Sequence, residues 1–303
     1  MAIYSIKDLE NLCGIKAHTI RIWENRYGIV TPQRTKTNIR YYQDEDLKLL
    51  LNIALLNKNG FKISKIAKMS HSEITAKVAS LSSVQLEEDT QLDALTLSMI
   101  EMDEFKFDHI INTNIRQIGF ERTMLEIIYP FLDKLSVLWL TGSIDPVQEN
   151  FISCLIRQKL IAAIDAIPPV QKDSGKKFII FLPEGETQEL SLLLIHYLIK
   201  LRKNKVIYLG SKISIQDVQD TCKIHNPDFI FTMITETYIK TPVQTYIKTL
   251  SESFPDSQIL LSGYQVVVQQ VKSSDNVTII NSINDMIYFL NAVNNKTASG
   301  LIE

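Results

Sequence analysis

The spacing of hydrophobic residues divides the chain into three parts. In the first, residues 1–75, short stretches of helical spacing are interrupted at 30–37 by a polar break that contains proline and threonine. The last, residues 176–303, has short apolar runs that alternate with amphipathic stretches. Between them, residues 76–90 are serine-rich and then acidic, which indicates a linker, and residues 91–169 keep a helical period.

Residues 91–169 hold no β-rich run, and their length fits a four-helix bundle. We expect the helices to be separated by breaks near residues 105–107, 118–121 and 141–146. Pro168 and Pro169 close this part because proline cannot continue a helix and restricts the residue before it.

Residues 176–303 predict a small α/β domain. Five apolar runs bounded by turn residues predict buried strands at 178–182, 206–209, 229–234, 259–261 and 277–280. The stretches between them predict helices, the clearest of which are 189–201, 215–225 and 242–251. Alternating buried strands and helices form a parallel sheet that is covered on both faces. The predicted fold class is therefore multidomain α and α/β, ending in a doubly wound parallel sheet.

The net charge of the chain is close to zero, but the charged residues are unevenly distributed along it. The 303 residues carry 32 Lys plus Arg and 34 Asp plus Glu, a net charge of −2. Residues 1–75 hold 12 of the basic and 7 of the acidic side chains, a balance of +5, so the remainder carries −7. A basic end on an acidic body favours a nucleic-acid partner that the total alone would discourage.

Composition excludes several other classes of protein. A hydrophobic fraction of 45% with 10 Gly and 9 Pro excludes a disordered or collagen-like chain. No apolar run approaches the ~18 residues of a membrane span, and the first residues lack the layout of a signal peptide. Cys13, Cys154 and Cys222 are widely spaced, which fits a reducing compartment and offers no metal site. We therefore expect a cytoplasmic protein with no membrane partner.

The basic amino-terminal part has the pattern of a DNA-binding module. Residues 4–15 predict a short helix followed by a turn at Gly14, and residues 16–27 predict a second helix with polar and basic side chains. This is the helix-turn-helix arrangement, whose second helix enters the major groove of DNA. Residues 31–42 then hold three basic residues and no acidic one, which predicts a hairpin, or wing, that binds phosphates.

Three ordered motifs make this module more specific. The second helix contains Arg21-Ile22-Trp23-Glu24-Asn25-Arg26-Tyr27-Gly28, the wing contains Pro32-Gln33-Arg34-Thr35 and Arg40-Tyr41-Tyr42, and Gly60-Phe61-Lys62-Ile63-Ser64-Lys65-Ile66 follows. Together they resemble the R-x-W-E-x-R-Y-G, wing and G-x-x-I-x-x-I motifs of the MerR family of winged helix-turn-helix regulators. The resemblance covers about 70 residues. It implies a sequence-specific regulator of transcription whose partner is a double-stranded DNA operator.

Side-chain chemistry suggests roles within this module. Arg21 is the first choice for a base contact because its planar guanidinium can donate two hydrogen bonds to a guanine edge. The other DNA-binding candidates lie on the second helix and in the wing: His18, Thr19, Arg26, Arg34, Lys36, Asn38, Arg40 and Tyr41. We expect those in the wing to hold phosphates. For Trp23 and Tyr27 a packing role is favoured over DNA contact, and Glu24 could simply pair with Arg21 or Arg26.

A second set of motifs lies in the carboxyl-terminal parts. In residues 135–150, Trp139 precedes Glu149 and Asn150 with nine residues between Trp and Glu, and residues 183–191 follow the first predicted strand. These stretches resemble the four-helix cap and the cobalamin-binding domain of methionine synthase and of the light-sensing CarH/LitR-like branch of the MerR family. The resemblance implies a flavodoxin-like sheet and a cobalamin site between the bundle and the sheet.

The residues that would bind cobalamin are replaced in this chain. The resemblance places histidines where Leu140, Asn150 and Gln188 stand, and glycines where Ser191 and Ser262 stand. A carboxamide is a poor ligand for a transition metal, and leucine cannot ligate one. We therefore expect a degenerate pocket and neither cobalamin nor a metal ion; its residues are Trp139, Glu149, Asn150, Glu186 and Gln188.

Several functions remain open for the carboxyl-terminal region. It could still bind cobalamin by shape, respond to another small molecule in the same crevice, or act only as a protein-interaction module. Glu184, Glu186 and Glu189 gather after the first strand, where they could perform acid–base chemistry or, as we favour, cap the next helix. No catalytic triad, phosphate loop or HExxH-like pair is visible, so we do not expect an enzyme. We expect a homo-oligomer, a dimer or a tetramer, that assembles through the bundle and the α/β body.

Overall fold

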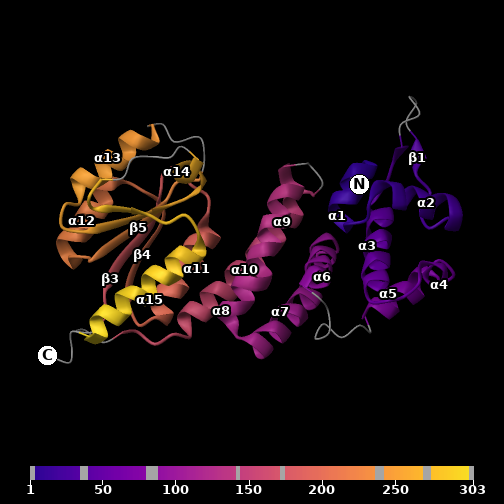
Figure 1. The fold of residues 1–303 in the computed structure, drawn as a ribbon, viewed down its shortest axis with the longest axis horizontal. Helices are drawn as coiled ribbons and strands as arrows, with labels where there is room; N and C mark the ends of the chain where they lie inside the picture. Colours follow the sequence, from indigo (N-terminus) through magenta and orange to yellow (C-terminus); the bar gives the residue numbers. More distant parts are fainter. Residues whose placement is uncertain are drawn as a thin grey trace. The chain divides into compact units, whose positions relative to one another are not determined.

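The computed structural model describes residues 4–34, 40–79, 88–140, 144–170, 175–235, 242–268 and 274–299. The chain forms two compact units, Met1–Leu155 and Ile156–Glu303, and each is described by itself (Figure 1). Within the described ranges, no helix is long and apolar enough to cross a membrane.

The first unit begins with a winged helix-turn-helix domain, as predicted. Its elements are α1 (Ile6–Cys13), α2 (Ala17–Tyr27), β1 (Gln33–Arg34), β2 (Arg40–Tyr41), α3 (Asp44–Lys58), α4 (Ile63–Ile66) and α5 (His71–Ala79). Helix α1 starts at Ser5, whose hydroxyl accepts a hydrogen bond from the Asp8 amide while the Asp8 carboxylate accepts one from the Ser5 amide. Helices α1 and α2 end at Gly14 and Gly28, whose φ angles of 67° and 63° would strain any other residue.

The wing and the domain core hold α2 in place. Strands β1 and β2 pair antiparallel, and Tyr4 bridges to Tyr42 directly after β2. On the inner side of α2, Ile20 is fully buried and Trp23 is 8% exposed. This confirms the packing role expected for Trp23.

The rest of the first unit is helical. Its elements are α6 (Glu88–Ile100), α7 (Glu104–Ile118), the short α8 (Phe120–Thr123), a π-helical turn η2 (Met124–Ile128), α9 (Tyr129–Leu140) and α10 (Pro146–Asp165), which continues into the second unit. The break predicted near residues 105–107 is misplaced by a few residues. Met102 has a φ of 51° and ends α6, and the Asp103 side chain accepts a hydrogen bond from the Lys106 amide and so caps α7.

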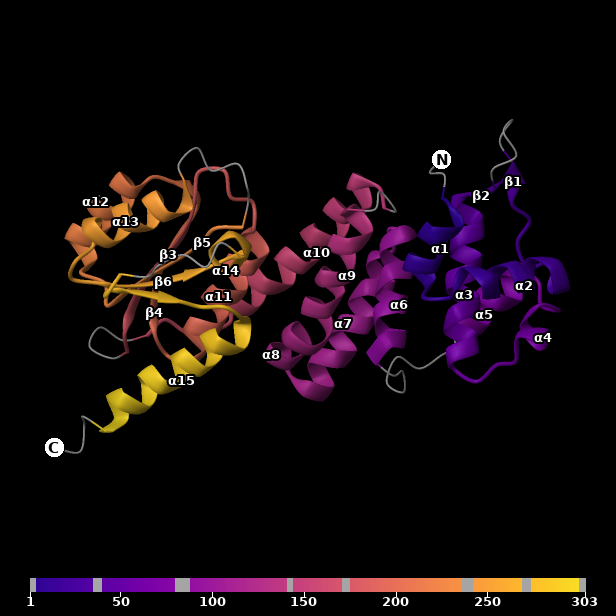
Figure 2. The same ribbon diagram turned by 45° about the horizontal axis from the view of Figure 1, so that its top comes forward.

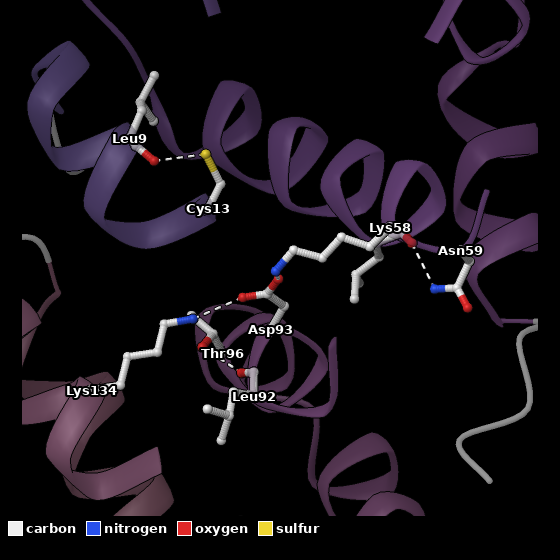
Figure 3. A network of polar contacts seen from close by, with 9 residues as sticks. Leu9, Cys13, Lys58, Asn59, Leu92, Asp93, Thr96 and Lys134 are labelled. Atoms are coloured by element: carbon white, nitrogen blue, oxygen red, sulfur yellow. Dashed lines mark hydrogen bonds and ion pairs between the residues drawn. The ribbon is translucent and has the colours of Figure 1, made fainter. Parts of the chain in front are cut away.

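A buried carboxylate joins the winged helix domain to the bundle. Helix α3 lies against α6, and α1 lies against α9. The Asp93 side chain of α6 is only 3% exposed. Its carboxylate forms ion pairs with the Lys58 ammonium of α3 at 2.5 Å and with the Lys134 ammonium of α9 at 2.9 Å (Figure 3). Beside this network the Cys13 thiol donates to the Leu9 carbonyl, and burial raises the pKa of the thiol to about 11, so it stays protonated.

The second unit contains the predicted parallel sheet. Its strands are β3 (Lys177–Pro183), β4 (Lys205–Ile213), β5 (Phe229–Met233), β6 (Gln258–Ser262) and β7 (Val277–Ile279), and its helices are α11 (Glu189–Leu201), α12 (Ile215–His225), α13 (Val243–Ser253), α14 (Tyr264–Val268) and α15 (Ile283–Ser299). The strand order β4-β3-β5-β6-β7, with every pairing parallel, is the flavodoxin-like order 2-1-3-4-5. Helices α11 and α12 have the bounds that the sequence predicts.

Helices cover both faces of this sheet. Helices α12 and α13 lie on one face and α11 and α15 on the other (Figures 1 and 2). The core under α12 and α13 joins Ile179 and Phe181 of β3 to Ile230 of β5, Ile259 of β6 and Ile247 of α13. A sheet covered in this way leaves the carboxyl ends of its strands as the place where a ligand would bind.

Candidate functional site

The outward face of α2 is a continuous polar surface with one apolar residue. Successive residues of an α-helix are about 100° apart, which places His18, Arg21, Ile22, Asn25 and Arg26 within an arc of about 140° on the side opposite the buried residues. All five are exposed. None of them is acidic, so the face is suited to a negatively charged partner.

The key side chains of this face are not engaged by the protein. Among the described residues, none forms a hydrogen bond or ion pair with the side chain of Arg21 or of Asn25. His18 lies 3.3 Å from the Thr19 hydroxyl, and the Arg26 guanidinium lies 5.4 Å from the centre of the Tyr27 ring. The structure thus leaves the functional groups of Arg21 and Asn25 free to contact another molecule. Sequence motifs predict a base contact for Arg21 and give no such role to Asn25 or Ile22.

Glu24 ties α2 to the wing instead of pairing with Arg21 or Arg26. Its carboxylate accepts a short hydrogen bond from the Tyr42 hydroxyl and lies 3.9 Å from the Arg40 guanidinium. Burial and the neighbouring Glu24 carboxylate raise the pKa of Tyr42, which keeps its hydroxyl as a donor. The expectation that Glu24 pairs with Arg21 or Arg26 is therefore wrong, because the base of the wing is closer to its carboxylate.

The predicted wing residues fall into two groups. Arg34 is exposed at the end of β1, and the Tyr41 hydroxyl donates to the Gln33 side chain at 2.6 Å. Arg40 lies at the base of the wing beside Glu24. Lys36 and Asn38 lie outside the described residues. Phosphate binding by the wing stays a prediction.

The carboxyl ends of β3 and β5 mark the point where the strand order of the sheet reverses. Glu186 follows β3, is 3% exposed, and accepts a hydrogen bond from the backbone amide of Thr235 after β5 at 2.7 Å. Its carboxylate therefore joins the segment after β3 to the segment after β5. Of the other two glutamates, Glu189 forms an ion pair with Arg157 at 2.9 Å, and Glu184 is exposed. Glu189 lies in the first turn of α11, where the capping interpretation places a carboxylate, whereas the Glu186 carboxylate accepts from Thr235.

The positions that would accept cobalamin are used differently here. Gln188 is the residue before α11 and makes no capping hydrogen bond with its side chain. The Ser262 hydroxyl donates to the Ile280 carbonyl at 2.8 Å, which ties the end of β6 to the residue after β7. A Cβ on Gly263 would lie 2.3 Å from the Ile234 carbonyl oxygen, so this turn already packs tightly against the end of β5. At this edge the chain offers a carboxamide at Gln188 and a hydroxyl at Ser262, where the resemblance implies an imidazole and a glycine.

Two buried hydroxyls near this edge were not found from the sequence. Thr232 of β5 is two residues from Ile230 and two from Ile234, so the three side chains share the face covered by α13, and Tyr246 of α13 packs against the same core. Neither the Thr232 nor the Tyr246 hydroxyl has a hydrogen-bond partner among the described residues. Burial, together with the charge of Glu186, raises the pKa of Tyr246. Only the burial of these residues, which the sequence does not show, distinguishes them.

The bundle residues of the predicted pocket lie in the first unit. Trp139 is in the last turn of α9, and its side chain is outside the described residues. Glu149 is half-buried and Asn150 is exposed in the first turns of α10. In the described part of the chain, no group of three or more His, Cys, Asp or Glu side chains is placed to hold a metal ion.

Comparisons with known proteins identify similarities of the amino-terminal residues and of a longer part of the chain. Residues 4–73 match the family model "MerR HTH family regulatory protein". The chain is 24% identical over 234 residues to the HTH-type transcriptional repressor CarH of Myxococcus xanthus, an alignment that covers 75% of this chain and 77% of CarH. The HTH-type transcriptional regulator MlrA of Escherichia coli K12 is 36% identical over 73 residues, or 24% of this chain and 30% of MlrA.

Solved structures show a weaker likeness. A cobalamin-binding protein from Desulfitobacterium hafniense aligns with 68% of this chain and 98% of its own length, at 14% identity and a TM-score of 0.33.

Proposed function

We propose that this MerR-type regulator of transcription, whose residues 4–73 are a helix-turn-helix domain, binds operator DNA with α2 in the major groove. The observation that carries the proposal is the outward face of α2, where the side chains of Arg21 and Asn25 are exposed and make no hydrogen bond or ion pair with described residues. Buried Trp23 and Glu24 fix the helix from its inner side, so the exposed groups are presented on a rigid element.

The two parts of the module have different tasks in this proposal. Arg21 contacts a guanine through two hydrogen bonds and so contributes sequence preference. Arg34 and the other basic residues of the wing contact phosphates, which position the domain on DNA without distinguishing bases. Arg40 contributes less to phosphate binding because the nearby Glu24 carboxylate already offsets its charge.

We propose further that the protein acts as a symmetric homo-oligomer, a dimer or a tetramer. One helix-turn-helix unit contacts one half-site, and two-fold related units contact two half-sites about one helical turn apart. Symmetric assembly of identical chains supplies that arrangement.

For the second unit we propose a role in sensing or assembly without cobalamin. Three observations support it. Gln188 offers a carboxamide where an imidazole would ligate cobalt. The Ser262 hydroxyl donates to the Ile280 carbonyl, and the Glu186 carboxylate accepts from the Thr235 amide. A different small molecule is a second candidate effector, because the buried hydroxyls of Thr232 and Tyr246 lack partners among described residues and buried polar groups ordinarily have one.

Selection of bound sequences from a pool of random DNA duplexes tests the DNA-binding proposal. The full-length chain should enrich a two-fold symmetric site, and Arg21→Ala should lose about ten-fold to one-hundred-fold of its preference for that site over random DNA. Arg122→Ala is the matched control, since Arg122 is an exposed arginine of α8 that pairs with Glu126. Enrichment of no sequence by the unaltered chain would contradict the proposal.

An absorption spectrum tests the cofactor proposal. After incubation with adenosylcobalamin in the dark and desalting, the protein should show no corrinoid absorption bands. Retained bands would contradict the proposal. For the second candidate, a thermal-shift screen of small metabolites should find a compound that stabilises the chain, by about 2.7 kcal/mol at one hundred times its dissociation constant.

A further inference from the structure

Ile22 is an apolar residue in the middle of the exposed face of α2. It lies one turn after His18 and one turn before Arg26, and its side chain is 51% exposed. The apolar residues Ile20 and Trp23 of the same helix point inward and are buried. About half of Ile22 thus stays in contact with solvent, and its place among polar neighbours suits a partner with both polar and apolar groups.

The major groove of DNA offers such a partner. The 5-methyl group of thymine projects into the groove and is the apolar group that bases present there. The adenine paired with it presents the N7 acceptor and the N6 donor, which match the carboxamide of an asparagine. Asn25 lies three residues after Ile22, so the two side chains are neighbours on the helix surface, with Cβ atoms about 5–6 Å apart.

Charge favours DNA over a protein partner for this face. The five exposed residues include Arg21 and Arg26 and no carboxylate. A protein surface that bound Ile22 would have to pair or desolvate both guanidinium groups, whereas DNA phosphates line the groove on both sides.

We propose that Ile22 and Asn25 together recognise one A·T base pair beside the guanine contacted by Arg21. Ile22 contacts the thymine methyl group, and the Asn25 carboxamide accepts from adenine N6 and donates to N7. The inference rests on the proposed function, because it requires α2 to lie in the major groove. It adds two base contacts that sequence motifs alone do not indicate.

Two modified bases separate these contacts from general loss of DNA binding. In the operator selected by the unaltered chain, each thymine is replaced in turn by deoxyuridine, which removes only the methyl group. At one position per half-site this change should weaken binding by the unaltered chain about four-fold. The Ile22→Ala variant should bind the unmodified operator more weakly than the unaltered chain does. Replacing the thymine at that position by deoxyuridine should not weaken its binding further.

The adenine opposite that thymine is then replaced by 7-deazaadenine, which removes the N7 acceptor. The unaltered chain should lose about five-fold in affinity, and the Asn25→Ala variant should not respond. Ile161→Ala serves as the control for residue type and exposure, because Ile161 of α10 is 50% exposed; it should respond to both modified bases as the unaltered chain does.

The outcomes distinguish this inference from the proposed function. If an operator is selected but Ile22→Ala responds to every deoxyuridine as the unaltered chain does, the contact with thymine is wrong and the DNA-binding proposal stands. The same holds for Asn25 if its alanine variant still responds to 7-deazaadenine. If no operator is selected, the proposed function and this inference both fail.

Discussion

The outward face of α2 and the carboxyl edge of the sheet are both places where polar side chains gather, and they differ in what those side chains bind. On α2, the side chains of Arg21 and Asn25 make no hydrogen bond or ion pair with described residues. At the sheet edge, Ser262 donates to Ile280, and Glu186 accepts from Thr235. The first set is available to another molecule, and much of the second set holds the fold together.

This difference separates a binding role from a structural one at the level of single residues. A side chain that bonds its own chain stabilises the folded state, and its removal leaves an unmet donor or acceptor. A side chain that faces solvent contributes little to stability and can be substituted without unfolding the protein. The two kinds of residue therefore respond in opposite ways to substitution: one loses stability and the other loses affinity.

The largest loss of stability is expected at Asp93, the most buried of the charged groups that hold elements together. Asp93→Ala leaves the ammonium groups of Lys58 and Lys134 close together without a counter-charge. Removal of one partner from a buried ion network costs about 3–5 kcal/mol; because the lysines are 35% and 22% exposed and can partly reach water, we expect about 3 kcal/mol. Urea unfolding of the full chain measures the change.

Asp220→Ala is the control for Asp93. Asp220 pairs with Lys223 on the helix surface, where the two side chains are 58% and 72% exposed and an ion pair contributes little to stability. Equal unfolding midpoints for the two variants would show that the Asp93 network does not hold α3, α6 and α9 together. A combined replacement of all three charged residues by leucine or methionine should recover most of the loss.

A smaller effect is expected from His196, a histidine of α11 in the second unit. Its ring stacks on Tyr208 at 5.2 Å, and burial, with the charge of Lys200, lowers its pKa from the ordinary 6.5 to about 4. As the pH falls, His196 is protonated in the unfolded chain before it is protonated in the folded chain. The stability that neutral His196 contributes is therefore fully present above pH 6.5 and is lost as the pH falls towards 4. Allowing for its partial exposure, the loss is about 1–2 kcal/mol.

The His196→Phe variant checks this assignment, since phenylalanine keeps the stacked ring and cannot titrate. Hydrogen exchange of the α11 and β3 amides in urea, at pH 7 and pH 4.5, gives the stability of the second unit at each pH. The variant should lose about 1–2 kcal/mol less than the unaltered chain between these values. An identical pH dependence for both proteins would mean that another group titrates.

Sequence predicted elements best where local signals determine them. The bounds of α12 follow from Ser214 and Asp217, which form a capping box at its start, and from Asn226, whose φ of 44° ends it. The face of α2 could likewise be drawn from helical periodicity once the helix was placed. Local pattern and a family resemblance therefore located the helix-turn-helix domain and the parallel sheet.

Contacts between distant residues could not be predicted in the same way. Asp93 binds lysines that are 35 and 41 residues away, and Glu186 binds an amide 49 residues away. Whether Ile22 is exposed depends on how α2 is rotated against the domain, which is decided by Ile20 and Trp23 packing inward. These properties follow from tertiary packing, so they cannot be predicted from the pattern of neighbouring residues in the sequence.

A loss of about 1 kcal/mol is expected at the sheet edge for Ser262→Ala, which removes the hydrogen bond to the Ile280 carbonyl. Hydrogen exchange of the β6 amides measures it. Thr249→Ala is the control, because its exposed hydroxyl bonds only to the Thr245 carbonyl in its own helix, and it should change stability by less than about 0.5 kcal/mol. If both variants were equally stable, the edge would not be held by Ser262, and a bound ligand could reach it.

The smallest change in stability is expected on α2, where the effect on DNA is large. Arg21→Ala and Asn25→Ala remove exposed side chains that make no hydrogen bond or ion pair with described residues, and alanine favours the helix, so the free energy of unfolding should change by less than about 0.5 kcal/mol. Thermal unfolding without DNA measures this, and operator affinity is measured on the same samples. A variant that lost both stability and affinity would assign its residue a structural role, because only a side chain that binds DNA and not its own chain loses affinity alone.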